Sequence, residues 1–157
     1  MAVVIADAGP LIAFAKINQL KLLPALFGSV LVTQAVVDEC LQGKGSDVDL
    51  IDKALQSNEL QCINTPYFQS ALSRSLGLGE QSCIEYALQT ESETLLIIDD
   101  ALARKHALRL DLSVVGTAAL LFAAERKGLI LSAEHQIEIL RESGYRISPK
   151  VVELLKS

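Results

Sequence analysis

Acidic residues stand at the points where two apolar segments of the sequence end. Asp7 follows the apolar run 3–6, and the pair Asp99 and Asp100 follows the apolar run 95–98. A run that is apolar on both faces is typical of a central strand in a parallel sheet. Because ligands bind at the carboxyl ends of such strands, these carboxylates are expected at one edge of the sheet and favour a functional site there. The alternative is that each Asp only caps the helix that follows it, a position that Asp favours.

Glu80 begins a helix predicted over 80–90. The apolar stripe of this helix consists of Cys83, Ile84, Ala87 and Leu88. On a helical wheel Glu80 falls near the centre of that stripe, whereas Glu85 falls on the opposite face and is expected to be solvated. A carboxylate in a core-facing position needs a partner or a functional reason to be there. The alternative is a first-turn acid that the helix dipole stabilises and that water still reaches.

Glu39 lies in a helix predicted over 33–41. The apolar face of this helix consists of Val36, Val37, Cys40 and Leu41. Glu39 flanks that face and can lean over the edge of the sheet, whereas Asp38 points nearly away from it and is expected on the surface.

The candidate site therefore consists of Asp7, Glu39, Glu80, Asp99 and Asp100. Several carboxylates do not share a pocket as bare anions, because their repulsion raises their pKa values. Mg²⁺ and Mn²⁺ are hard cations that prefer oxygen ligands and would neutralise this charge. Such ions turn water into a nucleophile and stabilise the charge that develops on a phosphodiester. The sequence offers no serine or cysteine nucleophile with a histidine partner, which favours hydrolysis by metal-bound water.

Strands and helices alternate along the whole sequence. The predicted strands are 3–6, 30–32, 60–63, 94–98 and 113–115. This alternation predicts an α/β fold, a three-layer sandwich with a mostly parallel central sheet and helices on both faces. The length of 157 residues and the lack of repeats or linkers favour a single domain over 1–157. The helix predicted over 117–127 is apolar nearly all round, so it is either deeply buried or part of an oligomer interface.

The composition limits the class of protein. The net charge of −5 argues against a broad electrostatic grip on nucleic acid, but not against an enzyme that binds nucleic acid through metal ions. No apolar run reaches the roughly 18–20 residues that span a membrane, and no basic segment of a signal peptide opens the sequence, so a cytoplasmic location is expected. Cys40, Cys62 and Cys83 are widely spaced among apolar residues and are expected to be buried free thiols.

Five segments resemble, in the same order, the motifs of the PIN domain family, in particular those of short prokaryotic PIN proteins related to the toxin ribonucleases of toxin–antitoxin pairs. The segments are 5–12 (IADAGPLI), 36–40 (VVDEC), 78–84 (LGEQSCI), 96–104 (LIIDDALAR) and 115–117 (VGT). They cover roughly the first 130 residues, and the helices expected over 131–157 lie outside them. No single segment is very specific, but the ordered set is.

The resemblance implies a parallel sheet, a divalent-metal site and endonucleolytic cleavage of single-stranded or structured RNA. Matched by position, the acidic quartet of the family is Asp7, Glu39, Glu80 and Asp99. Asp100 would replace or assist Asp99 as a ligand. The resemblance also implies a homodimer and, for a toxin, an antitoxin protein as partner.

Two other functions stay open at the level of the sequence. A PIN domain that binds nucleic acid or a protein without cutting is favoured by the acidic charge and by Ala8, since many relatives have Ser or Thr at that position. The presence of all the acids counts against it. A phospho-receiver also uses a strand-end acidic pair, but it would need a lysine after its last strand, where this sequence has Gly116 and Thr117.

Overall fold

The computed structural model describes residues 2–69 and 75–156, and these residues form a parallel sheet surrounded by helices. The strands of the sheet are β1 (Val3–Ala6), β2 (Val30–Thr33), β3 (Leu60–Ile63), β4 (Thr94–Ile97) and β5 (Ser113–Val115). Their order is β3-β2-β1-β4-β5, and every described pairing is parallel. The predicted α/β fold is confirmed, and the sheet is parallel throughout rather than mostly so.

The order of the strands reverses between β1 and β4. From β1 the chain builds outward through β2 to β3, and it then returns to the other side of β1 to add β4 and β5. The register of this central pair joins Ala6 to Ile97, and the backbone N–H of Asp7 donates to the carbonyl of Ile97 at 3.0 Å. In open α/β sheets such a reversal leaves a crevice at the carboxyl ends of the two strands. The residues that follow β1 and β4 therefore lie at the place where such folds bind their ligands.

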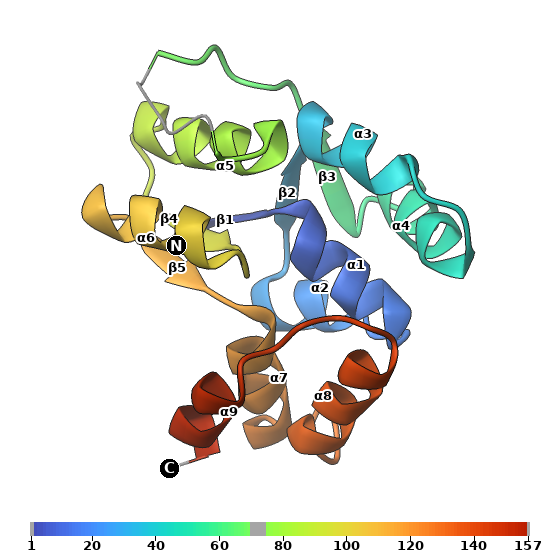
Figure 1. Cartoon of the computed structure of the whole chain (residues 1–157). Coiled ribbons are helices and arrows are strands. Elements are labelled where there is room, and N and C mark those ends of the chain that lie inside the picture. Colours follow the sequence, from blue (N-terminus) through green and yellow to red (C-terminus); the bar gives the residue numbers. More distant parts are fainter. Residues whose placement is uncertain (1, 70–74, 157) are drawn as a thin grey trace.

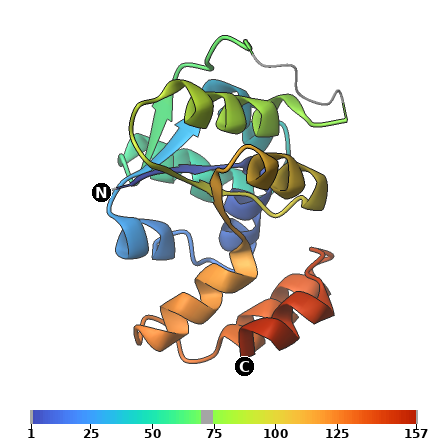
Figure 2. The ribbon, with the colours of Figure 1, turned by 90° about the vertical axis from the view of Figure 1, so that its left-hand side faces the viewer.

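Helices lie on both sides of the sheet. They are α1 (Ala8–Lys16), α2 (Leu22–Phe27), α3 (Gln34–Leu41), α4 (Ser46–Gln56), α5 (Leu78–Gln89), α6 (Ala101–Arg109), α7 (Thr117–Arg126), α8 (Ala133–Glu142) and α9 (Pro149–Lys156). In Figures 1 and 2, α5 lies above the strands and α1 and α2 lie below them, while α7, α8 and α9 gather beyond the sheet at the bottom of the view.

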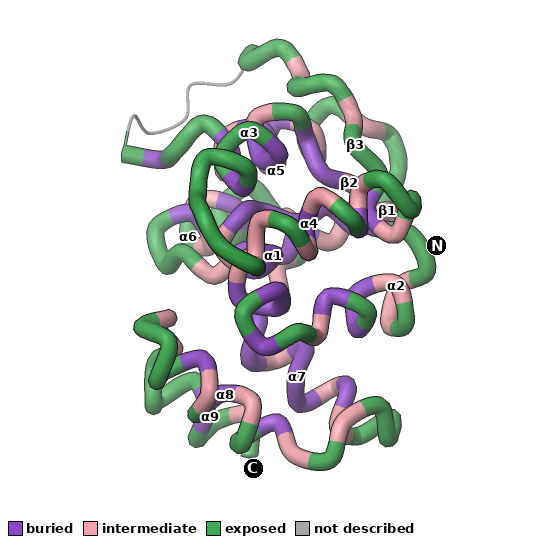
Figure 3. The backbone as a smooth tube through the Cα atoms, turned by 90° about the vertical axis from the view of Figure 1, so that its right-hand side faces the viewer, coloured by how far each residue is buried: buried purple, intermediate pink, exposed green. Residues whose placement is uncertain are grey.

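The core follows the central strands. In Figure 3 the buried stretches run through the middle of the molecule, along β1, β2 and α1. The apolar runs of β1 and β4 are buried because helices cover them on both faces. The edge strand β3 is different, since Gln61 and Cys62 are exposed. Burial was therefore predicted correctly for Cys40 and Cys83 but wrongly for Cys62, and all three thiols are free.

The helix α7 is buried by the two C-terminal helices. Its apolar residues Leu120, Leu121 and Phe122 are enclosed, and α7 packs against both α8 and α9. Other helices of the same chain thus cover the apolar residues of α7, as expected for the deeply buried alternative. In the described part of the chain, every helix falls short of the length and apolarity that crossing a membrane requires.

The prediction that Glu85 is solvated is wrong. Glu85 is fully buried, and its Oε1 accepts hydrogen bonds from the backbone N–H of Gln69 at 2.9 Å and from the side chain of Gln89 at 3.0 Å. Gln89 also donates to the carbonyl of Tyr67 at 2.5 Å. Residues 67 and 69 thus cover the outer face of this helix. A helical wheel shows only the pattern of the helix itself and cannot reveal such a cover.

Candidate functional site

Asp7 lies at the end of β1, in the extended residue that precedes α1. Its side chain does not cap that helix within the described structure, so the alternative interpretation of this residue as a simple helix cap does not hold. Only 5% of the residue is exposed, and its Oδ1 is buried without a hydrogen-bond partner among the described residues. A buried carboxylate oxygen in this condition is costly and calls for a ligand or a proton.

The first turn of α5 meets Asp7 and Glu39 through the bare face of Gly79. A Cβ atom at Gly79 would lie 3.0 Å from Oε1 of Glu39 and 3.2 Å from Oδ1 of Asp7. Carboxylates from β1 and from α3 therefore converge at this glycine. A side chain at this position would crowd both oxygens, so Gly79 keeps a small space open between them.

The acids of the site lie within one another's electric field. Burial raises the pKa of Asp7 to about 7, and the charges of Glu80, Glu39 and Asp99 add to this effect. Burial also raises the pKa of Glu80 to about 7, assisted by Asp100 and Glu39. The structure thus brings all the acids predicted from the sequence to one edge of the sheet. Glu80 is only half-buried, so water reaches it. The alternative interpretation of Glu80, a first-turn acid that the helix dipole stabilises, therefore also describes its surroundings.

Asp99 and Asp100 have different surroundings. Oδ2 of Asp100 accepts the backbone N–H of Ala103 at 2.9 Å, which makes Asp100 the N-cap of α6. Asp99 instead accepts three hydrogen bonds from residues far along the chain. Thr117 donates its backbone N–H to Oδ1 at 2.7 Å and its hydroxyl to Oδ2 at 2.5 Å, and the hydroxyl of Tyr145 also donates to Oδ2. The interpretation as a helix cap therefore holds for Asp100 and not for Asp99.

A buried pair of hydroxyl groups ties together the two helices that carry the glutamates. Thr33 caps α3, and its Oγ1 lies 2.7 Å from Oγ of Ser82 on α5. The Ser82 hydroxyl also lies 2.6 Å from the carbonyl of Gly79, to which it donates. Both side chains are fully buried. This network fixes the start of α3 relative to the first turn of α5. It thereby also positions Glu39 on α3 relative to Glu80 on α5.

Two contributors to the site were not predicted as site residues. Thr117 lies in the segment 115–117 that resembles the family, so its position carried a signal. Tyr145 carried only a weak one, as a lone aromatic residue between two amphipathic helices. Gly116, in the same segment as Thr117, borders the site through its bare face. A Cβ there would lie 2.9 Å from Oδ1 of Asp99 and 2.7 Å from Nη1 of Arg104, which donates to the carbonyl of Ile98 at 3.1 Å.

The buried cysteines near the acids do not act as nucleophiles. Burial and the charges of Glu39, Asp7 and Asp47 raise the pKa of the Cys40 thiol to about 12. Burial also raises the pKa of the Cys83 thiol well above its usual value. Since only the thiolate attacks an electrophile or binds a metal readily, these thiols stay inert at neutral pH.

The donor set fits a hard divalent cation. The groups that converge are carboxylate oxygens, which suit Mg²⁺ and Mn²⁺. Within residues 2–69 and 75–156, no three acidic, imidazole or thiol groups come together as a ready ligand set. The acids nevertheless repel one another, and Oδ1 of Asp7 faces the space left by Gly79. A cation bound among these acids would remove both the repulsion and the cost of burying Asp7.

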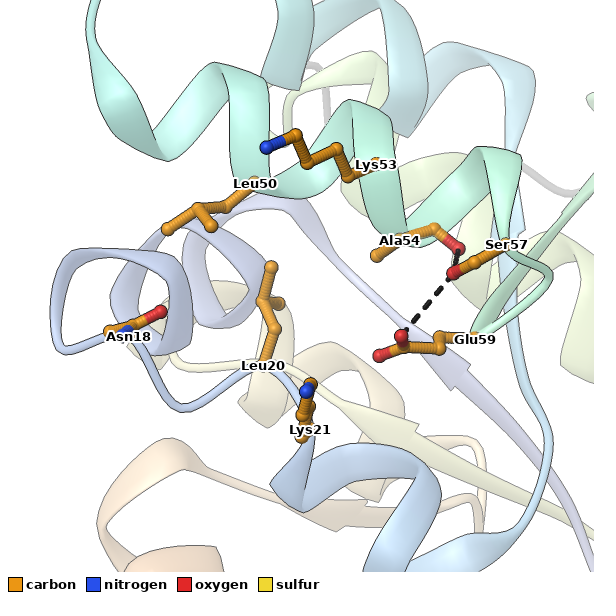
Figure 4. A pocket seen from close by; sticks show the side chains of 8 residues that line it. All are labelled: Asn18, Leu20, Lys21, Leu50, Lys53, Ala54, Ser57 and Glu59. Atoms are coloured by element: carbon orange, nitrogen blue, oxygen red, sulfur yellow. Dashed lines mark hydrogen bonds between the residues drawn. The ribbon is translucent and has the colours of Figure 1, made fainter.

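A separate pocket lies away from the acids. It has a volume of about 350 Å³ and is lined by Asn18, Leu20, Lys21, Leu50, Lys53, Ala54, Ser57 and Glu59. Figure 4 shows that these residues come from the connection between α1 and α2, from α4 and from the turn before β3. The pocket therefore flanks the amino end of β3 and shares no residue with the acidic site.

Comparison with known proteins agrees with the geometry of the site. No curated protein shows significant sequence similarity to the chain. A family model described as the PIN domain matches residues 3–157. This range contains the acids at the carboxyl edge of the sheet and also the C-terminal helices, which the motifs of the sequence did not reach. PIN domains have a nuclease-type fold and typically use divalent metals. The chain therefore belongs to the PIN domain family.

Proposed function

We propose that this protein is a metal-dependent endoribonuclease that hydrolyses RNA phosphodiester bonds with Mg²⁺ or Mn²⁺. The observation that carries the proposal is the environment of Asp7. Its carboxyl group is almost fully buried, it is surrounded by Glu39, Glu80 and Asp99, and its pKa is raised to about 7. Burying a carboxyl group costs free energy, so such a group is typical of a functional position. Carboxyl groups with perturbed pKa values in a crevice are likewise typical of functional sites.

The residues have distinct roles in this proposal. Asp7, Glu39, Glu80 and Asp99 would hold one or two divalent ions, with Asp100 as an assisting acid. When bound there, the ions supply a water of lowered pKa and neutralise charge on the phosphate. Thr117 holds the carboxylate of Asp99 in place through two hydrogen bonds.

The biological setting belongs to the same proposal. The similarity of the motifs to short prokaryotic PIN proteins supports a toxin role, with an antitoxin protein as partner and a homodimeric assembly. A cytoplasmic location is proposed from the sequence itself. The toxin role, the antitoxin and the homodimer depend on the resemblance, whereas the metal site also depends on the geometry of the carboxylates.

The first test is cleavage of a labelled RNA by the purified protein with Mn²⁺ or Mg²⁺. Asp7→Asn and Asp99→Asn are expected to abolish cleavage, because each removes a charge that would face the ion, and EDTA is expected to do the same. Asp38→Asn is the matched control, since Asp38 is an exposed acid next to Glu39 that accepts a hydrogen bond from Gln34. Undiminished cleavage by both site variants would defeat the proposal.

Binding of Mn²⁺ by isothermal titration separates catalysis from other roles. The wild-type protein is expected to bind Mn²⁺, and Asp7→Asn is expected to bind it more weakly. A wild-type protein that does not bind Mn²⁺ at millimolar concentration would point to a PIN domain that binds nucleic acid or a protein without cutting.

A further inference from the structure

The turn between α8 and α9 directs Tyr145 toward the acidic site. Gly144 has a φ of 91°, its N–H donates to the carbonyl of Arg141 at 3.0 Å, and the N–H of Tyr145 donates to the carbonyl of Leu140 at 3.0 Å. A glycine in this left-handed conformation is the usual way to end a helix and reverse the chain. In Figure 1 the segment after α8 passes directly below α1 on its way to α9. The turn thus brings Tyr145 close to the first turn of α1.

The segment is held on the far side of Tyr145 as well. The side chain of Arg141 donates to the carbonyl of Ile147 at 3.2 Å, and Ile147 packs against the hydrophobic core. The backbone on both sides of Tyr145 is therefore anchored, so the ring enters the site as part of a fixed turn.

The hydroxyl of Tyr145 lies between the ends of β1 and β4. It donates to Oδ2 of Asp99, and it lies 3.4 Å from the position that a Cβ atom of Gly9 would occupy in the first turn of α1. The first turn of α1 directly follows Asp7. Tyr145 therefore joins the C-terminal segment to the strand end that carries Asp99 and approaches the strand end that carries Asp7.

Tyr145 and Thr117 together form a three-donor clamp on Asp99. Oδ2 accepts the hydroxyl groups of both residues, whereas Oδ1 accepts, from the residues that the structure describes, the backbone N–H of Thr117 alone. Each carboxylate oxygen has two lone pairs. Both lone pairs of Oδ2 are used by the clamp, and among the described residues Oδ1 keeps one for another partner. The clamp thus fixes the orientation of the carboxylate and the oxygen through which it can bind a cation.

We propose that Tyr145 is a positioning residue of the acidic site, whose hydroxyl orients Asp99 for a divalent cation and so makes the C-terminal segment part of that site. This inference rests on the proposed metal-dependent function. Partners that orient a ligating carboxylate typically contribute about 10- to 100-fold to metal affinity.

The direct test is Mn²⁺ binding by Tyr145→Phe, which keeps the ring and removes the hydroxyl. We expect binding about 10- to 100-fold weaker than in the wild type. Tyr67→Phe is the matched control, because Tyr67 is 87% exposed, and it should bind Mn²⁺ as the wild type does. Unchanged affinity in Tyr145→Phe would make the contact merely structural, and tighter binding would mean that the hydroxyl competes with the ion. Either result overturns the inference. If the wild type itself binds no Mn²⁺, the proposed function fails as well.

A spectroscopic readout reports on Tyr145 without any enzymatic assay. The chain has three tyrosines and no tryptophan, so its near-ultraviolet difference spectrum is dominated by tyrosine. Addition of Mg²⁺ is expected to perturb the tyrosine band, since the ion changes the charge of the carboxylate to which Tyr145 donates. The perturbation should vanish in Tyr145→Phe and persist in Tyr67→Phe. A perturbation that persists in Tyr145→Phe would contradict the inference.

A second variant leaves the tyrosine in place and disturbs only its turn. Gly144→Ala puts a side chain on a residue with a φ of 91°, where in the described structure a Cβ meets nothing within 4 Å. We expect weaker Mn²⁺ binding, because backbone strain moves Tyr145 away from Asp99. Gly128→Ala is the matched control, with a φ of 75°, the same open surroundings among described residues, and a place after α7. Equal Mn²⁺ affinities of the two variants would overturn the inference.

Discussion

Asp7 is the acid of the site whose protonation depends most on its surroundings. Burial is the largest cause of its raised pKa, and the charges of Glu80, Glu39 and Asp99 follow after the opposing effect of the backbone N–H of Ala8. The folded protein therefore binds a proton at Asp7 more tightly than the unfolded chain, whose carboxyl has a pKa near 3.8. By linkage, this proton stabilises the folded state at low pH and not at high pH.

Without divalent cations, the free energy of unfolding is expected to fall as the pH rises from about 4 to about 7. The contribution of Asp7 is fully present below the unfolded pKa of 3.8 and is lost as the pH passes through about 7. Asp7→Asn should flatten this slope and exceed the wild type in stability at pH 8, by an amount on the order of a few kcal/mol. Urea unfolding in EDTA at pH 5 and pH 8 measures both effects, with Asp38→Asn as the control that keeps the slope. A wild type that gains stability over this range relative to Asp7→Asn would contradict the prediction.

Single residues differ in how well the sequence predicted them. Asp7 and Asp99 were predicted to end strands at one edge of the sheet, and they do, because an apolar run followed by an acid is a local pattern. Glu85 was misplaced because a segment outside its helix covers it. Tyr145 could not be linked to Asp99, because 46 positions separate the two residues and nothing local shows where the turn after α8 points.

At the scale of elements, the site depends on how closely α5 approaches β1 and α3. The helix starts at Leu78, two residues before its predicted start, so Gly79 lies inside the first turn. The sequence places a glycine there but does not show which residues it contacts. Contact with Asp7 and Glu39 explains the absence of a side chain at Gly79.

Gly79→Ala is expected to weaken Mn²⁺ binding more than it changes the fold. Alanine favours a helix over glycine by up to about 1 kcal/mol, but its Cβ would also lie 3.2 Å from Cγ2 of the buried Val36, so the two effects on the melting temperature oppose each other. The new Cβ would lie 3.0 Å from Oε1 of Glu39 and 3.2 Å from Oδ1 of Asp7, and it would push these oxygens apart. Calorimetry of melting and of Mn²⁺ binding measures the two effects separately. Gly77→Ala is the control, because its Cβ would lie at an ordinary 3.6 Å from Glu80. Wild-type Mn²⁺ affinity in Gly79→Ala would refute the expectation.

At the scale of the whole molecule, segments far apart in the sequence meet at one site. Asp7 directly follows the first strand, and Tyr145 comes from the turn before the last helix. The alternation of strands and helices predicted the sheet and its edge, because each element carries its own apolar pattern. The docking of α8 and α9 was not predictable in this way, since an amphipathic helix shows that it packs but not against what. The family match over residues 3–157 includes these helices.

The net charge of the protein leads to a prediction about the salt dependence of RNA cleavage. The net charge is −5, because 19 acidic residues outnumber 14 Lys and Arg, so the divalent ions of the site should provide most of the attraction to phosphate. We expect kcat/KM for RNA cleavage at saturating Mg²⁺ to fall less than about tenfold between 50 and 200 mM KCl, whereas proteins with 6–10 phosphate contacts lose about 10³- to 10⁵-fold in affinity. Initial rates at low RNA concentration measure the slope, and the ionic strength of the MgCl₂ is held constant. A steep slope would show that a basic surface, and not the acidic site with its ions, governs the encounter with RNA.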